Sequence, residues 1–363
     1  MLLVSGSLDT RTGGYIYDRR MMEGLRQRGW TVDVAELDAG FPHPAPAALD
    51  QAARALGALP DGTLVLVDSL ALGAMPDLLA REASRLRFVG LVHLPLAAAY
   101  GLDPAAAALL ESSERRALGA MELVIVTGKA TLPLLARYDV PSDRIVVVEP
   151  GTDPAPMASS RSSVLPQSYV ASGFSRTDRR PLELLTVATL HPGKGHEILL
   201  DALAAVPHRD WRLVCAGSLT RDPATADRVR TTARRLRLDD RVTLAGDLDG
   251  PALAACYDRA DLFVLATLQE TYGMAVAEAL ARGLPVVATS TGAIPELVGD
   301  EAGVLVPAGD VPALAGALSR VMGDADRRAR LAEGARRVRD RLPTWEAASG
   351  RMAAALERVA SHG

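Results

Sequence analysis

The sequence predicts an α/β protein of two domains, each built around a parallel β-sheet. Short apolar runs, typical of buried strands, alternate with helical segments along most of the 363 residues. This alternation makes successive strands parallel and places helices on both faces of the sheet. It is interrupted over residues 151–181, which are rich in Ser and Pro and lack periodicity, so we expect a linker there. A chain of this length can form two separate cores.

The first half, residues 1–150, is expected to form the amino-terminal domain. Its expected strands are Leu2–Ser5, Thr31–Ala35, Thr63–Asp68, Arg87–Val92, Leu123–Val126 and Ile145–Val148. The helices expected between them are Tyr15–Arg28, Pro46–Leu56, Ala71–Ser84, Pro104–Leu118 and Ala130–Arg137.

The second half, residues 182–342, repeats the alternation. Its expected strands are Leu184–Leu190, Arg212–Ala216, Val242–Gly246, Leu262–Leu265, Val286–Thr289 and Gly303–Val306. After Pro343 the tail, residues 345–363, is expected to form one amphipathic helix over Trp345–Val359.

The composition indicates a globular protein that does not bind nucleic acid. Apolar residues make up 48 % of the chain and charged residues 23 %, the formal net charge is −4, and no basic face is apparent. Cys215 and Cys256 lie in apolar runs without CxxC spacing, which favours buried, reduced thiols. No signal peptide pattern precedes the first strand, and no apolar run approaches the ~18 residues of a membrane span. We therefore expect a cytoplasmic protein.

A pair of glutamates follows the expected strand Leu262–Leu265. Glu270 lies in the loop at the carboxyl end of that strand, where ligands bind in open α/β sheets, and Glu278 lies in the helix expected over Gly273–Arg282. The first amides of this helix, Tyr272–Met274, have no partners within the helix and can bind an anion such as a diphosphate. The arrangement suits a nucleotide sugar. A solvated loop glutamate and an ordinary helix glutamate could have the same spacing. The pair alone therefore does not show that this region binds a nucleotide sugar.

Lys194 is a second candidate ligand of phosphate. The chain has 40 basic residues, but Lys129 and Lys194 are its only lysines. An ordinary surface cation in this chain is therefore usually an arginine, which makes a lysine at position 194 notable. Lys194 lies between Gly193 and Gly195, which allow close backbone approach, and an ammonium on a flexible stem suits a phosphate oxygen in a tight loop. The alternative is an ordinary lysine in a turn that starts a helix.

Together these segments resemble glycosyltransferase family 4. The resemblance extends from Leu184 to Trp345 and is looser over residues 1–150. It is carried by Val187–Gly195 (VATLHPGKG), the Glu-x7-Glu pair, Gly283–Ala288 (GLPVVA) and Gly292–Glu296 (GAIPE). The resemblance implies the GT-B fold, with two Rossmann-like domains whose parallel sheets face each other across a cleft. It also implies transfer from a nucleotide sugar with retention of anomeric configuration, and a tail helix that crosses back to the first domain.

The family pattern, carried over residue by residue, implies a set of site residues. The implied catalytic residues are Glu270, Lys194 and His93. The implied donor-binding residues are Gly13, Gly14, Thr189, Lys194, Thr271, Tyr272, Gly273, Met274 and Glu278. By this pattern Glu278 holds the ribose, Glu270 the donor sugar and Lys194 the diphosphate.

His93 and the loop Ser5–Gly14 are the candidates in the first half. His93 follows the strand Arg87–Val92 at its carboxyl end, and in the family a histidine here lies beside the transferred sugar. A lone histidine is also often structural. The Gly13–Gly14 pair at a helix start can place amides around a phosphate, although a plain strand–helix turn would look the same.

Other site classes fit less well. The loop Ser5–Gly14 lacks the G-x-G-x-x-G of dinucleotide-binding proteins, and Ala188 stands where a P-loop needs glycine. Histidine spacing indicates no metal site. The sequences Asp247–Asp249 and Asp324–Asp326 could suggest a metal-dependent transferase, but we expect Asp249 and Asp326 to be helix caps.

The chain also departs from the family at Thr189, where relatives usually have arginine, and at Thr271, where they usually have glycine. Thr189 removes a cation that would face the phosphate, which leaves the strength of donor binding open, and Thr271 narrows the space for backbone approach to the sugar. We expect no cofactor beyond a UDP- or GDP-linked sugar, no metal, and a small-molecule, glycan or lipid-linked acceptor. The alternatives are a nucleotide-sugar 2-epimerase and a non-catalytic sugar-nucleotide-binding protein.

Overall fold

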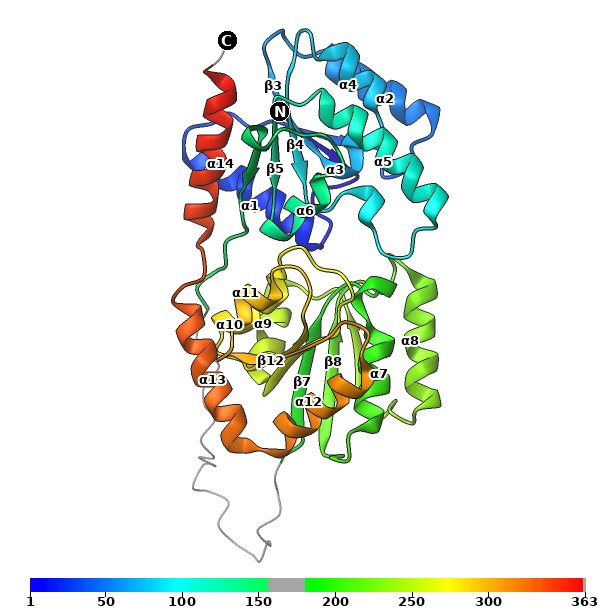
Figure 1. Cartoon of the computed structure of the whole chain (residues 1–363), viewed down its shortest axis with the longest axis vertical. Coiled ribbons are helices and arrows are strands. Elements are labelled where there is room, and N and C mark those ends of the chain that lie inside the picture. The colour runs from blue at the N-terminus through cyan, green and yellow to red at the C-terminus, as the bar shows by residue number, and fades with distance from the viewer. Residues whose placement is uncertain (156–179, 362–363) are drawn as a thin grey trace, which may run out of the picture.

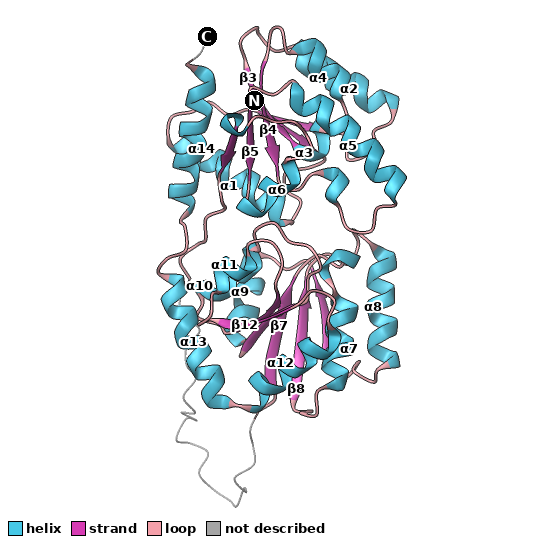
Figure 2. Cartoon of the chain, in the orientation of Figure 1, coloured by secondary structure: helices cyan, strands magenta, loops and turns pink. Residues whose placement is uncertain are grey.

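The computed structural model describes residues 1–155 and 180–361 and shows two α/β units stacked along the long axis of the molecule (Figure 1). Each unit has a 6-stranded parallel sheet with helices on both faces (Figure 2). The expected linker falls mostly on residues 156–179, which lie outside the described part of the chain. The amino-terminus and the last described helix lie in the same unit (Figure 1).

The amino-terminal sheet has the strand order β2-β1-β3-β4-β5-β6, with every neighbouring pair parallel. Its strands are β1 (Leu2–Ser5), β2 (Val34–Leu37), β3 (Leu64–Asp68), β4 (Arg87–Val92), β5 (Leu123–Val126) and β6 (Ile145–Val147). The helices are α1 (Gly13–Gln27), α2 (Pro46–Gly57), α3 (Ser69–Leu72), α4 (Pro76–Glu82), α5 (Pro104–Gly119) and α6 (Leu132–Leu135).

The carboxyl-terminal sheet has the order β12-β11-β10-β7-β8-β9. Its strands are β7 (Leu182–Val187), β8 (Trp211–Ala216), β9 (Val242–Gly246), β10 (Leu262–Leu265), β11 (Val286–Thr289) and β12 (Gly303–Val306). The helices are α7 (His196–Ala205), α8 (Pro223–Arg235), α9 (Gly250–Arg259), α10 (Met274–Ala281), α11 (Ile294–Val298), α12 (Val311–Gly323) and α13 (Ala325–Arg339). The fully buried strand β10 lies between β7 and β11, so the loops that follow β7 and β10 lie side by side.

The structure corrects several expected elements. The helix expected over Ala71–Ser84 is two helices, because Pro76 cannot donate a backbone hydrogen bond within a helix and instead starts α4. The helix expected over Ala130–Arg137 is a 3₁₀ turn followed by the four-residue α6, which has a proline in its first turn. The strand expected over Leu184–Leu190 ends at Val187, and its last residues form a loop toward the cleft.

The second strand is shifted as well. It was expected over Thr31–Ala35, but its pairing with β1 begins at Val34 and continues to Leu37. Leu37 belongs to the core under the sheet, so burial of this side chain accounts for the later register.

The last helix, α14 (Trp345–Ala360), packs beside α1 on the amino-terminal sheet (Figure 1). Met352 and Leu356 are buried in the same core as Leu2 and Val4. Close packing requires Gly24 in α1, because a Cβ there would lie 2.3 Å from the Cβ of Ser349. No helix among residues 1–155 and 180–361 is long and apolar enough to cross a membrane.

Candidate active site

One cavity of about 470 Å³ lies between the two domains, and every site residue predicted from the sequence lines it. Gly13, Gly14 and His93 face it from the amino-terminal domain. All other predicted residues line it from the loops after β7 and β10 and from α10, with Met274 at the start of the helix and Glu278 farther along it. The carboxyl ends of strands from both sheets therefore meet at this cavity.

Lys194 and Glu270 form an ion pair in the cavity wall. The Lys194 Nζ lies 2.8 Å from the Glu270 Oε2, and the two side chains are 29 % and 17 % exposed. The loops that carry them are joined by a hydrogen bond of 2.8 Å from the amide of Leu268 to the carbonyl of Gly193. Gly195 is needed for this approach, since its φ is +65° and a Cβ would lie 2.0 Å from the carbonyl oxygen of Ala266.

The start of α10 offers free backbone donors to the cavity. Gly273 precedes the helix with φ +98°, and no side chain caps the helix end. Within the described residues, the amides of Tyr272 and Gly273 donate no hydrogen bond. The Thr271 amide instead donates to Glu270 Oε1 at 3.2 Å. This helix end can therefore accept an anionic group from the cavity.

Glu278 is half-buried and held by Tyr257. The Tyr257 hydroxyl donates to Glu278 Oε2 at 2.8 Å, and the guanidinium of Arg282 lies 4.6 Å from the centre of the Tyr257 ring. Burial raises the pKa of Glu278 above its usual range, although the hydrogen bond from Tyr257 lowers it in part. One oxygen is fixed by tyrosine, which leaves the other free to bind a hydroxyl donor in the cavity.

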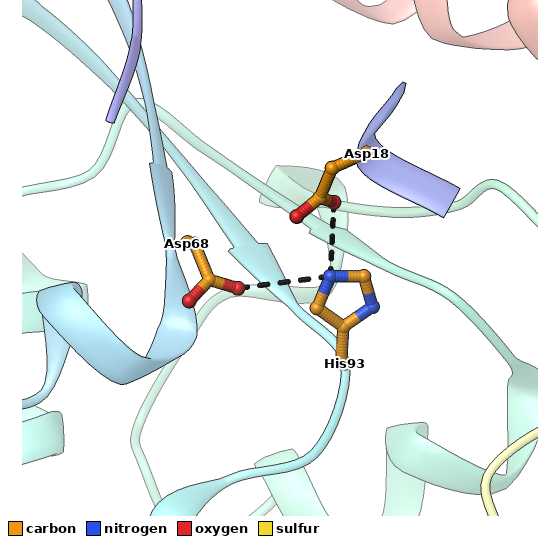
Figure 3. A group of neighbouring side chains, drawn as sticks. All are labelled: Asp18, Asp68 and His93. Atoms are coloured by element: carbon orange, nitrogen blue, oxygen red, sulfur yellow. Dashed lines mark hydrogen bonds and ion pairs between the residues drawn. The ribbon is translucent and has the colours of Figure 1, made fainter. Parts of the chain in front are cut away.

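His93 lies between two buried carboxylates, as Figure 3 shows. Its Nε2 is 3.0 Å from Asp18 Oδ1, on α1, and 3.6 Å from Asp68 Oδ2, at the end of β3. Burial lowers the pKa of His93, but the charge of Asp18, its hydrogen bond and the charge of Asp68 together raise the pKa above its ordinary value. Burial and the charge of Asp18 raise the pKa of Asp68 to about 6. His93 is therefore oriented by a charged network.

These three groups are also possible metal ligands. One ligand atom from each of Asp18, Asp68 and His93 lies within 4.8 Å of the others. The same nitrogen of His93 already contacts both carboxylates, so the observed arrangement is satisfied as an ion-pair network. Sequence spacing missed this group, because its members come from α1, β3 and the loop after β4.

The structure also places residues in the site that the sequence analysis did not propose as site residues. Arg11 and Arg19 line the cavity from the loop before α1 and from α1, and Asp247 lines it from the carboxyl-terminal domain. Tyr257 and Asp18 act behind it, on Glu278 and His93. The charged residues of the glycine loop were visible in the sequence, but nothing in the spacing showed that Asp18 or Tyr257 would meet a site residue.

The Asp-x-Asp sequences act at helix starts, with one correction. Asp249 caps α9 by accepting from the amide of Ala252 at 2.9 Å, as predicted. The residue that caps α13 is Asp324, which accepts from the amide of Arg327 at 2.8 Å, so the prediction of Asp326 was wrong. The extended backbone of Asp324 permits the capping geometry, whereas Asp326 already lies in the first turn.

Comparison with known proteins agrees with this geometry. Residues 181–324 match the family described as Glycosyl transferases group 1, a segment that contains Lys194, Glu270 and Glu278. The match lies within the carboxyl-terminal domain and covers less than half of the chain. The chain is 33 % identical over 247 residues to a D-inositol 3-phosphate glycosyltransferase of Salinispora tropica, and 31 % identical over 221 residues to one of Corynebacterium glutamicum. These matches cover 66 % and 59 % of the chain and 51 % of each relative, so the chain spans about half the length of the curated relatives it matches.

Solved structures show the fold of the whole chain. The chain is similar to sucrose-phosphate synthase from Thermosynechococcus elongatus, with a TM-score of 0.81 and 23 % identity over 100 % of this chain and 99 % of that one. It is also similar to Anabaena Alr3699/HepE in complex with UDP and glucose, with a TM-score of 0.76 and 18 % identity over 98 % and 99 % of the chains. The chain has the GT-B fold. The predicted fold and the predicted resemblance to glycosyltransferases are thus confirmed.

Proposed function

We propose that this protein is a glycosyltransferase that moves a sugar from a nucleoside diphosphate sugar to a hydroxyl acceptor with retention of anomeric configuration. The observation that carries the proposal is that every predicted site residue lines one and the same cavity between the domains. The curated relatives are named as glycosyltransferases, which supports the same reaction class. The acceptor would be a small molecule, a glycan or a lipid-linked hydroxyl compound.

The donor would lie along the carboxyl-terminal wall of the cavity. The half-buried Glu278, which has one free oxygen, would accept hydrogen bonds from the ribose. The diphosphate would lie on Lys194, the Tyr272–Met274 amides and the amides of the Gly13–Gly14 loop. The related Anabaena protein was solved with UDP and glucose, which supports a UDP-linked donor here, with GDP as the second choice.

The reaction breaks the bond between the sugar C1 and the diphosphate oxygen, forms a bond between C1 and the acceptor oxygen, and passes the proton of the acceptor hydroxyl to the leaving diphosphate. The bonding electrons stay on that oxygen, so the diphosphate gains negative charge as it leaves. An ammonium has three donors. Lys194 can therefore keep its ion pair with Glu270 while it donates another hydrogen bond to the leaving oxygen. Glu270 would orient the sugar hydroxyls and stabilise positive charge at the ring. His93, held by Asp18, would lie beside the transferred sugar and the acceptor.

We propose that this chemistry needs no divalent metal ion, because Lys194 and the backbone amides would stabilise the leaving group directly. Buried thiols at Cys215 and Cys256, both free, support a reducing compartment such as the cytoplasm.

A thermal-shift screen of UDP-, GDP- and ADP-linked sugars tests the proposal first, because a ligand that binds the native state raises the midpoint of unfolding. The donor that binds is then incubated with and without candidate acceptors and analysed by HPLC. Transfer requires that nucleoside diphosphate is released only when acceptor is present. Conversion of donor alone would instead indicate a 2-epimerase, and tight binding without turnover a non-catalytic sugar-nucleotide-binding protein.

A further inference from the structure

The charges that line the cavity of about 470 Å³ between the domains, called the main cavity below, are not equally available to a ligand. Three permanent cations line it, Arg11, Arg19 and Lys194, together with the carboxylates Asp247, Glu270 and Glu278. Lys194 already forms an ion pair with Glu270. A donor diphosphate carries more than one negative charge, and an ammonium that is partly neutralised does not balance it alone.

Arg19 is used to hold the loop between β1 and α1. Its Nη1 donates to the carbonyl of Leu8 and, at 3.2 Å, to that of Thr10. The same loop is fixed from β2, where Glu36 Oε1 accepts from the amide of Leu8 at 2.8 Å. The positive charge of Arg19 therefore stabilises the loop, and Arg11 lies on the anchored segment.

Arg11 has no hydrogen-bond or ion-pair partner among residues 1–155 and 180–361. It lies two residues before Gly13 and lines the same cavity as Thr189 and Lys194, but from the opposite domain. Its loop is anchored, so fewer backbone conformations are lost when the guanidinium binds a ligand. A guanidinium can donate two parallel hydrogen bonds to phosphate oxygens.

We propose that Arg11 binds the diphosphate of the donor from the amino-terminal domain, opposite Lys194. This inference rests on the proposed function and adds a residue and a charge to it. The diphosphate would then be held from both domains at once. Arg11 would supply a cation to the cavity from the amino-terminal domain. Thr189, which lines the same cavity from the carboxyl-terminal domain, has a neutral side chain and supplies none.

The test compares Arg11→Gln with Arg221→Gln. Arg221 also lacks a partner among the described residues, but it lines two neighbouring cavities and not the main one. Both substitutions remove one positive charge near the cleft, so they change the long-range field similarly. Calorimetry with UDP and with uridine, or with GDP and guanosine if the donor screen selects GDP, measures the part of the affinity that depends on phosphate.

We expect Arg11→Gln to weaken UDP binding by roughly 10- to 100-fold, as for the loss of hydrogen bonds to a charged group, and to leave uridine binding within about 2-fold. Arg221→Gln should change the UDP affinity by less than about 3-fold, and Arg11→Lys should recover part of the loss. Circular dichroism and unfolding curves check that each variant is folded.

Equal losses for UDP and uridine, equal losses in the two glutamine variants, or an unchanged UDP affinity in Arg11→Gln would each overturn the role of Arg11. In those cases the wild-type protein would still bind UDP and transfer sugar, so the proposed function would stand. A wild-type protein that binds no nucleoside diphosphate and no nucleotide sugar would overturn both proposals.

Discussion

Replacing Lys194 with alanine should remove most of the activity while leaving the fold intact. Lys194 is the cation nearest to Glu270, with 2.8 Å between Nζ and Oε2, and it faces the cavity from the loop after β7. If its ammonium stabilises the leaving diphosphate, the substitution removes one preorganised electrostatic contact. It also leaves Glu270 unpaired beside the phosphates, which adds repulsion.

The expected sizes of the two effects differ. Loss of one such contact lowers kcat/KM by ~10²–10³, or about 3–4 kcal/mol in the barrier. The free energy of unfolding should change by about 1 kcal/mol or less, because the ion pair is partly exposed and such pairs contribute little net stability. Activity should therefore fall far more than stability.

The only other lysine provides a matched control. Lys129 forms an ion pair with Glu296 at 3.1 Å, both side chains are exposed, and Lys129 does not line the cavity. Steady-state kinetics and urea unfolding of Lys194→Ala and Lys129→Ala compare the same substitution in two ion pairs. Lys129→Ala should keep kcat/KM within a few-fold. Near-normal kcat/KM in Lys194→Ala, or equal losses in the two variants, would refute the reasoning.

Three further predictions follow from the same cavity. Glu278→Gln should raise the donor KM and leave kcat within a few-fold, whereas Glu270→Gln should lower kcat by ~10² or more; the reverse pattern in steady-state kinetics would exchange their roles. Transfer should persist in excess EDTA, and complete loss with rescue by manganese would point to Asp18, Asp68 and His93 as metal ligands. The raised pKa of His93 stabilises the folded state fully below its unfolded pKa of about 6.5, and this contribution is lost as the pH rises through the higher folded pKa. Replacement of His93 by Asn should therefore make the free energy of unfolding fall less steeply with pH above pH ~6.5. An unchanged slope would contradict this contribution of His93.

The parts of the site that follow from strand order were predictable from the sequence. Lys194 and Glu270 lie in the loops at the carboxyl ends of β7 and β10, which are neighbours in the sheet. The strand pattern of the sequence was therefore enough to place both residues in one region. The ion pair between them was not predicted, because a spacing of 76 positions carries no information on side-chain direction.

Contacts between distant helices and strands were not predictable. Asp18 looks like an ordinary residue of α1, and only the packing of α1 on the sheet places it against His93, 75 positions later. The helix expected over Ala71–Ser84 was wrong although Pro76 was visible, because apolar periodicity was given more weight than the proline. In both cases tertiary packing or backbone chemistry outweighed the local pattern.

The packing of α14 makes the first domain discontinuous in sequence. Its core is completed by α14, which follows the carboxyl-terminal domain in the sequence, and the segment after β6 lies beside the segment that leads into α14, where the Thr152 amide donates to the Pro343 carbonyl at 2.8 Å. A fragment that ends at residue 155 would lack Met352 and Leu356 and would expose the apolar side of α1 to water. Cutting this protein at its domain boundary would thus not yield two autonomous halves, and the amino-terminal side of the cleft can be completed only after the carboxyl-terminal domain has been synthesised.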